Sequence, residues 1–216
     1  MSYKILLAKI ILSCRAKDFL DGNLYMNTDA YFAAMNADDI ARADKDEGAD
    51  EILQIKEIAI ANKNKKWIPI GGVKSPLIYR RGNKEGINIL CMYSITNQDD
   101  FHFDERNLNF GDTAIVIKDA KEFINRFKSA AKIAGRRLLH GPVEYIDKNK
   151  HHGQMGPFKK FNNYSYQSEF RFVLFGGNGE AIRFPIGDIR DISLIYSSSE
   201  LYKLARTKNN LTKKDS

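Results

Sequence analysis

One segment of this chain, Tyr164 to Phe175, constrains the fold more than any other. Polar side chains in it alternate with aromatic and apolar ones, which is typical of a β-strand because successive side chains point to opposite faces. Gln167, Glu169 and Arg171 would then share one face, and the aromatic side chains would share the other. We expect the aromatic face to be core. The polar face is then either a solvated surface or a row of groups that carries chemistry.

Size and composition favour a single globular unit. The chain has 216 residues, 43% of them hydrophobic, which is enough for one sizeable core. We expect one domain over residues 1–205 and a basic, flexible tail over residues 206–216. Cys14 and Cys91 lie far apart without metal-ligand spacing, which predicts a cytoplasmic protein with no metal site. The apolar start of the chain is too short to span a bilayer, so no membrane partner is expected.

Hydrophobic periodicity predicts more strands than helices. The best helix opens at Asp119 and ends near Gly135. Residues 63–76 are expected to form a loop or hairpin connection, and Gly176 to Gly179 a hairpin turn. Strands are expected over residues 3–12, 24–27, 52–60, 87–95, 113–117, 142–145, 166–175, 181–184 and 192–196. Few helices are long enough for parallel crossovers, so we predict an α+β fold with a mostly antiparallel sheet and short flanking helices.

A net charge of +7 favours anionic partners, and nucleic acid is the commonest of these. From Lys148 to Lys160 the chain contains no acidic residue. This segment offers cations for phosphates and rings on which unpaired bases can stack. The alternative is a solvated basic loop whose aromatic side chains anchor it to the core. The candidate nucleic-acid-binding residues are Lys148, Lys150, Phe158, Lys159 and Lys160.

The order of these features resembles the ADP-ribosyltransferase superfamily, in particular bacterial proteins found near toxin–antitoxin and phage-defence loci. The most specific part is Gln167-Ser168-Glu169, which is similar to the Glu/Gln-x-Glu motif of that superfamily. The strand end from Cys91 to Thr96 resembles the serine-containing strand that supports the NAD pocket. The run from Gly22 to Asn27, with the later run from Arg42 to Gly48, is similar to the opening of those bacterial proteins.

The resemblance implies a split β-sheet core and NAD as a substrate. Glu169 would be catalytic and would stabilise the positive charge that develops on the ribose as nicotinamide leaves. Gln167, also catalytic, would orient the acceptor. Ser94 would brace Glu169, and Tyr93 would offer a stacking surface for nicotinamide. Arg171 would contact NAD, although a cross-strand salt bridge is the commoner fate of such a residue.

The chain departs from the family pattern in its first strand, where the family has an NAD-binding arginine or histidine. Here that strand offers only Lys4 and Lys9, while Arg15 lies just beyond it. Arg80 and Arg81 lie in a later loop. The cation that would bind NAD is therefore left unassigned.

The function predicted from the sequence is that of a cytoplasmic, NAD-dependent ADP-ribosyltransferase-like toxin. Its acceptor would be RNA or single-stranded DNA, and it would act in phage defence or in a toxin–antitoxin system with an antitoxin protein as a second partner. One alternative is an NAD glycohydrolase, with water as the acceptor. The other is a non-catalytic nucleic-acid- or protein-binding module on the same fold.

Overall fold

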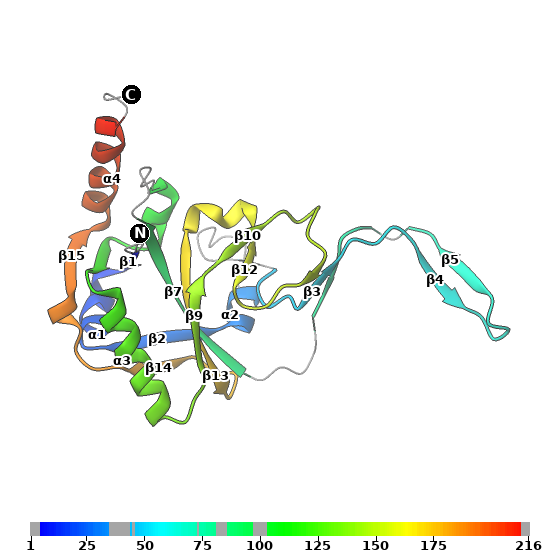
Figure 1. Cartoon of the computed structure of the whole chain (residues 1–216), viewed down its shortest axis with the longest axis horizontal. Coiled ribbons are helices and arrows are strands. Elements are labelled where there is room, and N and C mark those ends of the chain that lie inside the picture. The colour runs from blue at the N-terminus through cyan, green and yellow to red at the C-terminus, as the bar shows by residue number, and fades with distance from the viewer. Residues whose placement is uncertain are drawn as a thin grey trace.

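A mostly antiparallel β-sheet forms the centre of the computed structural model, which describes residues 5–34, 44, 46–72, 74–80, 86–96 and 103–212 (Figure 1). Within these residues, the sheet contains β1 (Ile5–Ile11), β2 (Asn23–Thr28), β7 (Gly86–Thr96), β8 (Thr113–Ile117), β9 (Leu138–Pro142), β13 (Glu169–Gly177), β14 (Ile182–Pro185) and β15 (Ser193–Ser197). Its strand order is β14-β2-β7-β1-β8-β15, and β13 pairs with both β7 and β9. The expected mixed α+β class with mostly antiparallel strands is confirmed.

Strand β7 pairs with β13 along one edge and with both β1 and β2 along the other. Tyr93 of β7 pairs with Ala8 of β1 and with Glu169 of β13, so β1 and β13 lie on opposite edges of β7. Ile89 of β7 pairs with Asn27 of β2 and with Val173 of β13, so β2 also lies opposite β13. β1 and β2 therefore occupy different stretches of the same edge of β7. This divergence sets the position of the candidate site described below.

Helices cover the sheet. They are α1 (Ala16–Leu20), α2 (Asp29–Ala34), α3 (Ala120–Ile133) and α4 (Ser198–Thr212), with short 3-10 turns η1 (Ser13–Arg15), η2 (Glu105–Phe110), η3 (Asn162–Gln167) and η4 (Arg190–Ile192). α3 packs Phe123 and Phe127 against Phe172 of β13, and this aromatic contact lies in the largest hydrophobic cluster. The helix begins after Asp119, whose side chain accepts a hydrogen bond from the backbone of Glu122. The prediction of this helix is confirmed.

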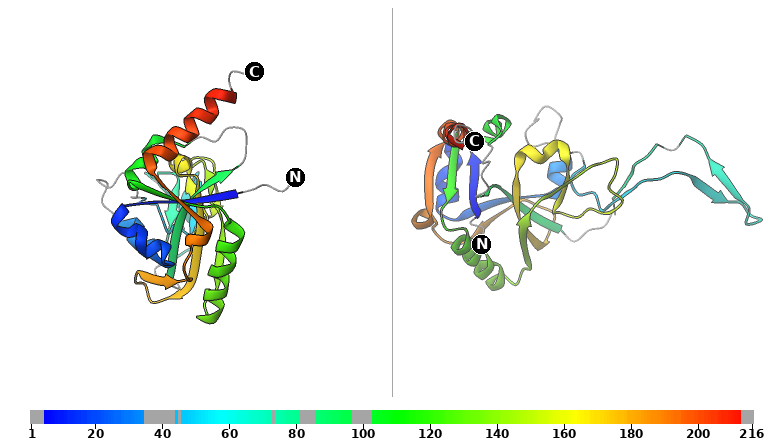
Figure 2. Two further views of the ribbon diagram at one scale, coloured as in Figure 1. Left: turned by 90° about the vertical axis from the view of Figure 1, so that its left-hand side faces the viewer. Right: turned by 45° about the horizontal axis from the view of Figure 1, so that its top comes forward.

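The shorter strands form three further small sheets. β10 (Glu144–Ile146) runs parallel to β12 (Lys159–Phe161), and β3 (Glu51–Leu53) pairs with β6 (Leu77–Tyr79) and β11 (Gly153–Gln154). Among the strands that the structure describes, β4 (Ile58–Ala61) and β5 (Trp67–Ile70) pair only with each other, and they project far from the main sheet (Figure 1 and the right-hand view of Figure 2). We call residues 58–70 the arm.

Three expectations about elements are corrected. The strand expected over residues 52–60 is two strands, β3 and β4, because residues 54–57 lead from the domain into the arm. The turn from Gly176 to Gly179 does not close a hairpin, since β14 pairs with β2 and not with β13. Residues 206–212, assigned to a flexible tail, continue α4. Among the described residues, no helix combines the length and apolar character that a membrane crossing requires.

Candidate functional site

β13 carries two buried charged side chains on one face and aromatic side chains on the other. Glu169 and Arg171 pair with Tyr93 and Cys91 of β7. Phe170 lies on the opposite face, in the cluster that packs against α3. From Glu169 to Arg171, the expected alternation of a core face and a polar face is confirmed. The polar face is not a solvated surface, however, because Glu169 is 8% exposed and Arg171 is 1% exposed.

Gln167 reaches the same region by a different route. It is the last residue of η3, not part of the strand that was expected to begin at Tyr166. Ser168 adopts a left-handed conformation at φ 41°, and its backbone N–H donates to Ser165. This turn ends the 3-10 helix and starts β13 at Glu169, which breaks the strict alternation. Gln167 is nevertheless buried at 5% exposure beside Glu169.

Arg171 joins two acidic side chains that are far apart in the sequence. Its Nε donates to Glu169 Oε2 at 2.6 Å. Its two terminal nitrogens donate to the two carboxylate oxygens of Glu47 at 2.8 and 2.7 Å, which is a bidentate pair. Its Nη1 also donates to the backbone oxygen of Pro157 at 2.7 Å. The guanidinium is therefore held in one orientation by three residues.

Lys160 completes the cluster from β12. Its ammonium group donates to Gln167 Oε1 at 2.7 Å and to Glu169 Oε1 at 2.9 Å. Asp44 Oδ2 lies 3.5 Å from the same nitrogen. We call this set the Glu169 network; its members are Asp44, Glu47, Lys160, Gln167, Glu169 and Arg171. It contains three carboxylates and two cations, so it carries a net negative charge when all five groups are ionised.

The network keeps Glu169 in its charged form. Burial alone would raise the pKa of the Glu169 carboxyl, but the charges and hydrogen bonds of Arg171 and Lys160 outweigh burial and hold that pKa well below its usual value. The pKa of Lys160 is raised, because Glu169, Glu47 and Asp44 outweigh the effect of burial. Burial raises the pKa of Asp44. Glu169 is thus a fixed charge at neutral pH, and it can act electrostatically but not as a general acid.

A cavity of about 500 Å³ opens against this network. It lies where β1 and β2 diverge from β7, and its wall includes Glu169, Gln167 and Arg171. Lys9 of β1, whose ammonium donates to the backbone oxygen of Cys91 at 2.7 Å, belongs to the same wall. Further polar wall residues from the β1–β2 region are Arg15, Asp18, Asn23, Tyr25, Asn27 and Arg183. The cavity therefore has acidic and basic groups at defined positions around it.

The two residues predicted on β7 have different positions relative to this cavity. Tyr93 belongs to the wall, and its ring packs on Phe103 at a centroid distance of 5.0 Å. Ser94 alternates to the other face of the strand and, among the described residues, is not part of the cavity wall. Its backbone N–H donates to Ser168 at 2.7 Å. Ser94 thus contacts the turn before Glu169 through its main chain.

Of the candidate NAD-binding cations in or after the first strand and in the later loop, the structure describes Lys9, Arg15 and Arg80. Lys9 and Arg15 both line the cavity. Arg80 is not among the described wall residues; it lies 3.8 Å from Asp46, and its side chain is 42% exposed. Lys4 and Arg81 lie outside the described residues.

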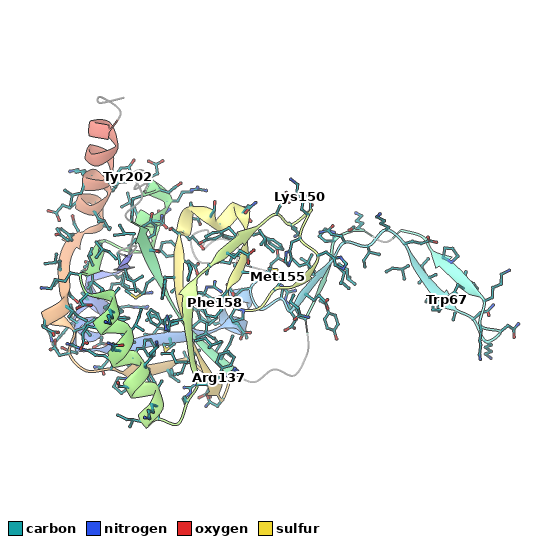
Figure 3. All side chains as sticks on the ribbon, in the orientation of Figure 1. Trp67, Arg137, Lys150, Met155, Phe158 and Tyr202 are labelled. Carbon is teal, nitrogen blue, oxygen red and sulfur yellow. The ribbon has the colours of Figure 1, made fainter. Side chains whose placement is uncertain are left out.

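The basic segment predicted to bind nucleic acid is largely neutralised by acids from elsewhere. Lys160 is buried in the Glu169 network, so its placement on an open, phosphate-binding loop is corrected. Lys148 lies 3.5 Å from Asp46, and Lys159 lies 3.9 Å from Glu144. Lys150 keeps an 84% exposed side chain, 3.8 Å from Asp147. Phe158 is half-buried beside Gly141 of β9, and Figure 3 labels it on the domain side of the molecule.

Sequence reasoning did not identify Asp44 and Glu47 as members of the site. They lie in an acidic, glycine-containing run that is typical of a solvated loop, and the resemblance of the run from Arg42 to Gly48 to the bacterial proteins assigned no role to either residue. Their burial at 3% and 5% exposure depends on Lys160 and Arg171, more than a hundred residues later in the chain. No local pattern reports such a pairing.

Comparison with known proteins gives no family for the chain. No family model matches it, and neither a curated protein nor a solved structure matches it.

Proposed function

We propose that this chain is a cytoplasmic, NAD-dependent ADP-ribosyltransferase-like toxin that modifies RNA or single-stranded DNA. The observation that carries the proposal is the position of Glu169: a buried, ionised carboxylate in the wall of a cavity of about 500 Å³. That volume lies within the range of about 300–1,000 Å³ typical of small-molecule sites. A role in phage defence or in a toxin–antitoxin system, with an antitoxin as partner, follows from the family resemblance alone.

The electrostatics of the cavity support transfer chemistry on a sugar. A fixed carboxylate stabilises positive charge as it develops, and this effect is largest where water is excluded. Glu169 meets both conditions, because its pKa is held low by Arg171 and Lys160 and because it is 8% exposed.

The remaining wall residues provide complementary groups. Lys9, Arg15 and Arg183 would contact the diphosphate of the dinucleotide, since all three line the cavity. Tyr93 would lie against the nicotinamide ring. Gln167, whose Oε1 accepts from Lys160 and whose amide nitrogen donates to the Tyr166 hydroxyl at 3.4 Å, would position the acceptor.

The decisive experiment incubates the protein with labelled NAD and separate pools of RNA, DNA and protein. We expect label in the nucleic-acid pools for the wild type and a loss of about 10²–10³-fold for Glu169→Gln, the size seen when a charge-stabilising group is removed. Glu169→Asp keeps the negative charge and tests position alone. Glu144→Gln, a surface carboxylate on β10 with a 67% exposed side chain, is the matched control and should transfer normally.

Folding must be measured alongside activity, because Glu169→Gln leaves Lys160 and Arg171 without one of their counterions. Circular dichroism and urea unfolding of each variant separate loss of chemistry from loss of fold. Equal transfer by wild type and a folded Glu169→Gln would remove Glu169 from the mechanism. Nicotinamide release that is undiminished without any macromolecule would instead identify an NAD glycohydrolase.

A second candidate, a binding module without catalysis, is favoured by one observation. Each carboxylate oxygen of Glu169 already accepts a charged hydrogen bond, one from Lys160 and one from Arg171. Such a network can serve to hold β12 and β13 together. In that case NAD would not raise the melting temperature, since a ligand that binds only the folded state must stabilise it. A rise in melting temperature with NAD would exclude this candidate for the NAD site.

A further inference from the structure

The arm, residues 58–70, has no structural partner within the described part of the chain. Among the described strands β4 and β5 pair only with each other, and the arm projects away from the domain in Figure 1 and in the right-hand view of Figure 2. A lone two-stranded hairpin is marginally stable in water. This one also exposes large apolar side chains, with Trp67 at 68% and Ile60 at 60% exposure. Exposed apolar surface of this kind marks an interaction site.

We propose that the arm binds single-stranded nucleic acid, with backbone phosphates on its lysines and a base stacked on Trp67. The inference rests on the proposed function only for its choice of a nucleic acid as acceptor. Binding itself needs neither NAD nor Glu169.

All charged side chains of the arm are positive. Residues 58–70 contain Lys63, Lys65 and Lys66 and no aspartate or glutamate. All three lysines are exposed, and none forms an ion pair with any residue that the structure describes. Lys148, Lys159 and Lys160 of the basic segment, in contrast, lie within 4.0 Å of carboxylates. The arm therefore carries positive charge that no described carboxylate neutralises, unlike these three lysines of the basic segment.

The turn that carries these lysines has a defined backbone. The Asn62 side-chain oxygen accepts from the backbone N–H of Asn64 at 2.9 Å and of Lys66 at 3.0 Å. The backbone N–H of Asn62 donates to the Lys66 oxygen at 2.9 Å. Lys65 adopts a positive φ of 62°. The lysines thus extend from fixed backbone positions, which reduces the entropy lost when phosphates bind.

The two faces of the arm differ. Ile58 pairs with Ile70 and Ile60 with Ile68, so the four isoleucines share one face. Trp67 pairs with Ala61 on the other face, where Ala59 and Pro69 are its neighbours. These small residues leave the indole ring open, next to Lys66 in the chain. An aromatic ring beside cations matches a chain of alternating bases and phosphates.

Gln54, a few residues before the arm and called here its base, is hydrogen-bonded to the loop that carries Lys150, the one strongly exposed lysine of the basic segment. The Gln54 backbone N–H donates to His152 Nδ1 at 3.0 Å, and the Gln54 side-chain nitrogen donates to the backbone oxygens of Lys148 and His151 at 2.7 and 2.9 Å. The loop that carries Lys150 is thereby fixed next to the arm. Figure 3 labels Lys150 over this base and Trp67 toward the far end. A strand bound to the arm would continue toward the domain past Lys150.

The test measures binding of fluorescent single-stranded RNA and DNA oligonucleotides to the full chain by anisotropy, without NAD and over a range of salt concentrations. The triple variant Lys63→Gln, Lys65→Gln, Lys66→Gln should weaken binding and lower the slope of log K against log salt by about 2, at about 0.7 per phosphate contact. Trp67→Ala should weaken binding by about 5- to 150-fold, the effect of losing one stacked base.

The isoleucine face supplies the matched control. Ile60→Thr with Ile68→Thr alters the opposite face and keeps β-branched residues, so nucleic-acid binding should be unchanged. Binding that is lost in this variant but survives the lysine and Trp67 changes would overturn the proposal and assign the arm to a protein partner or a second copy of this chain. Unchanged binding in all variants, or absence of binding in the wild type, would overturn it as well.

The outcomes for the arm and for the catalytic proposal are separable. If wild type binds oligonucleotides through the arm but transfers no label from NAD, the catalytic proposal fails and the arm proposal stands. If transfer occurs at wild-type rate in the triple lysine variant and in Trp67→Ala, with binding also unchanged, the arm proposal fails alone.

Discussion

The Glu169 network and the arm both contain cationic side chains, but under opposite conditions. In the network, Arg171 and Lys160 are 1% and 5% exposed, and each contacts carboxylates. On the arm, Lys63, Lys65 and Lys66 are exposed and form no ion pair with any described residue. A buried charge is costly unless it is paired and hydrogen-bonded, whereas an exposed charge is already stabilised by water. The network charges therefore constrain the fold, while the arm charges remain available to a partner.

The largest expected effect is that of breaking the network. Arg171→Met leaves the Glu47 carboxylate without its bidentate partner and removes one of the two cations on Glu169. We expect a loss of about 3–5 kcal/mol in the free energy of unfolding, because one buried charge is left uncompensated. Urea unfolding followed by circular dichroism measures it.

A double variant sharpens this result. Adding Glu47→Leu to Arg171→Met removes the stranded carboxylate and should recover part of the lost stability, since Glu169 still has Lys160 at 2.9 Å. The single variant Glu47→Leu completes the comparison. If the loss of unfolding free energy in the double variant equals the sum of the losses in the two single variants, Glu47 and Arg171 do not interact in solution.

The next effect is on the pH dependence of the free energy of unfolding, and it arises from Glu169 in the network. The pKa of Glu169 is lower in the folded state than its ordinary value, so its contribution to stability is fully present above about pH 4.3 and is lost as the pH falls below that value. The stability difference between wild type and Glu169→Gln should shrink below about pH 4.3 by up to about 1.4 kcal/mol per pH unit. Urea unfolding at several pH values from neutral to acidic checks this, and a difference that stays constant throughout would contradict it.

The smallest effect is expected on the arm. Lys65→Gln and Trp67→Ala should change the free energy of unfolding by no more than about 0.5 kcal/mol, because neither side chain packs against the domain. Trp67 is 68% exposed, and its strand pairs only with β4. Thermal and urea unfolding provide the measurement. A large loss of stability in Trp67→Ala would mean that the arm packs on the domain, and the contrast between the two regions would disappear.

Much of the fold follows from local patterns. α3 was expected because Phe123 and Phe127 recur at helical spacing after the capping residue Asp119, and the structure contains that helix. The two faces of β13 were expected from alternation at Phe170 and Arg171. Such features depend on residues a few positions apart, which is why a single sequence reports them.

The features that the sequence did not reveal depend on distant partners. Lys160 was placed in an open basic loop, because two of the three acids near it, Asp44 and Glu47, lie more than a hundred residues earlier in the chain. The run Gly176-Gly177-Asn178-Gly179 indicated a hairpin turn, but β14 pairs with β2, near the start of the chain. The run 63–76 was expected as a loop or hairpin connection. Its projection as an isolated arm follows from the lack of any strand that pairs with β4 or β5 in the described residues.

The bond between Glu47 and Arg171 links positions 124 residues apart, and it has a consequence for biosynthesis. During translation Glu47 leaves the ribosome long before Arg171, so an incomplete chain carries Glu47 without its bidentate partner. A nascent polypeptide cannot complete the Glu169 network, or the cavity wall that includes it, until Arg171 has emerged.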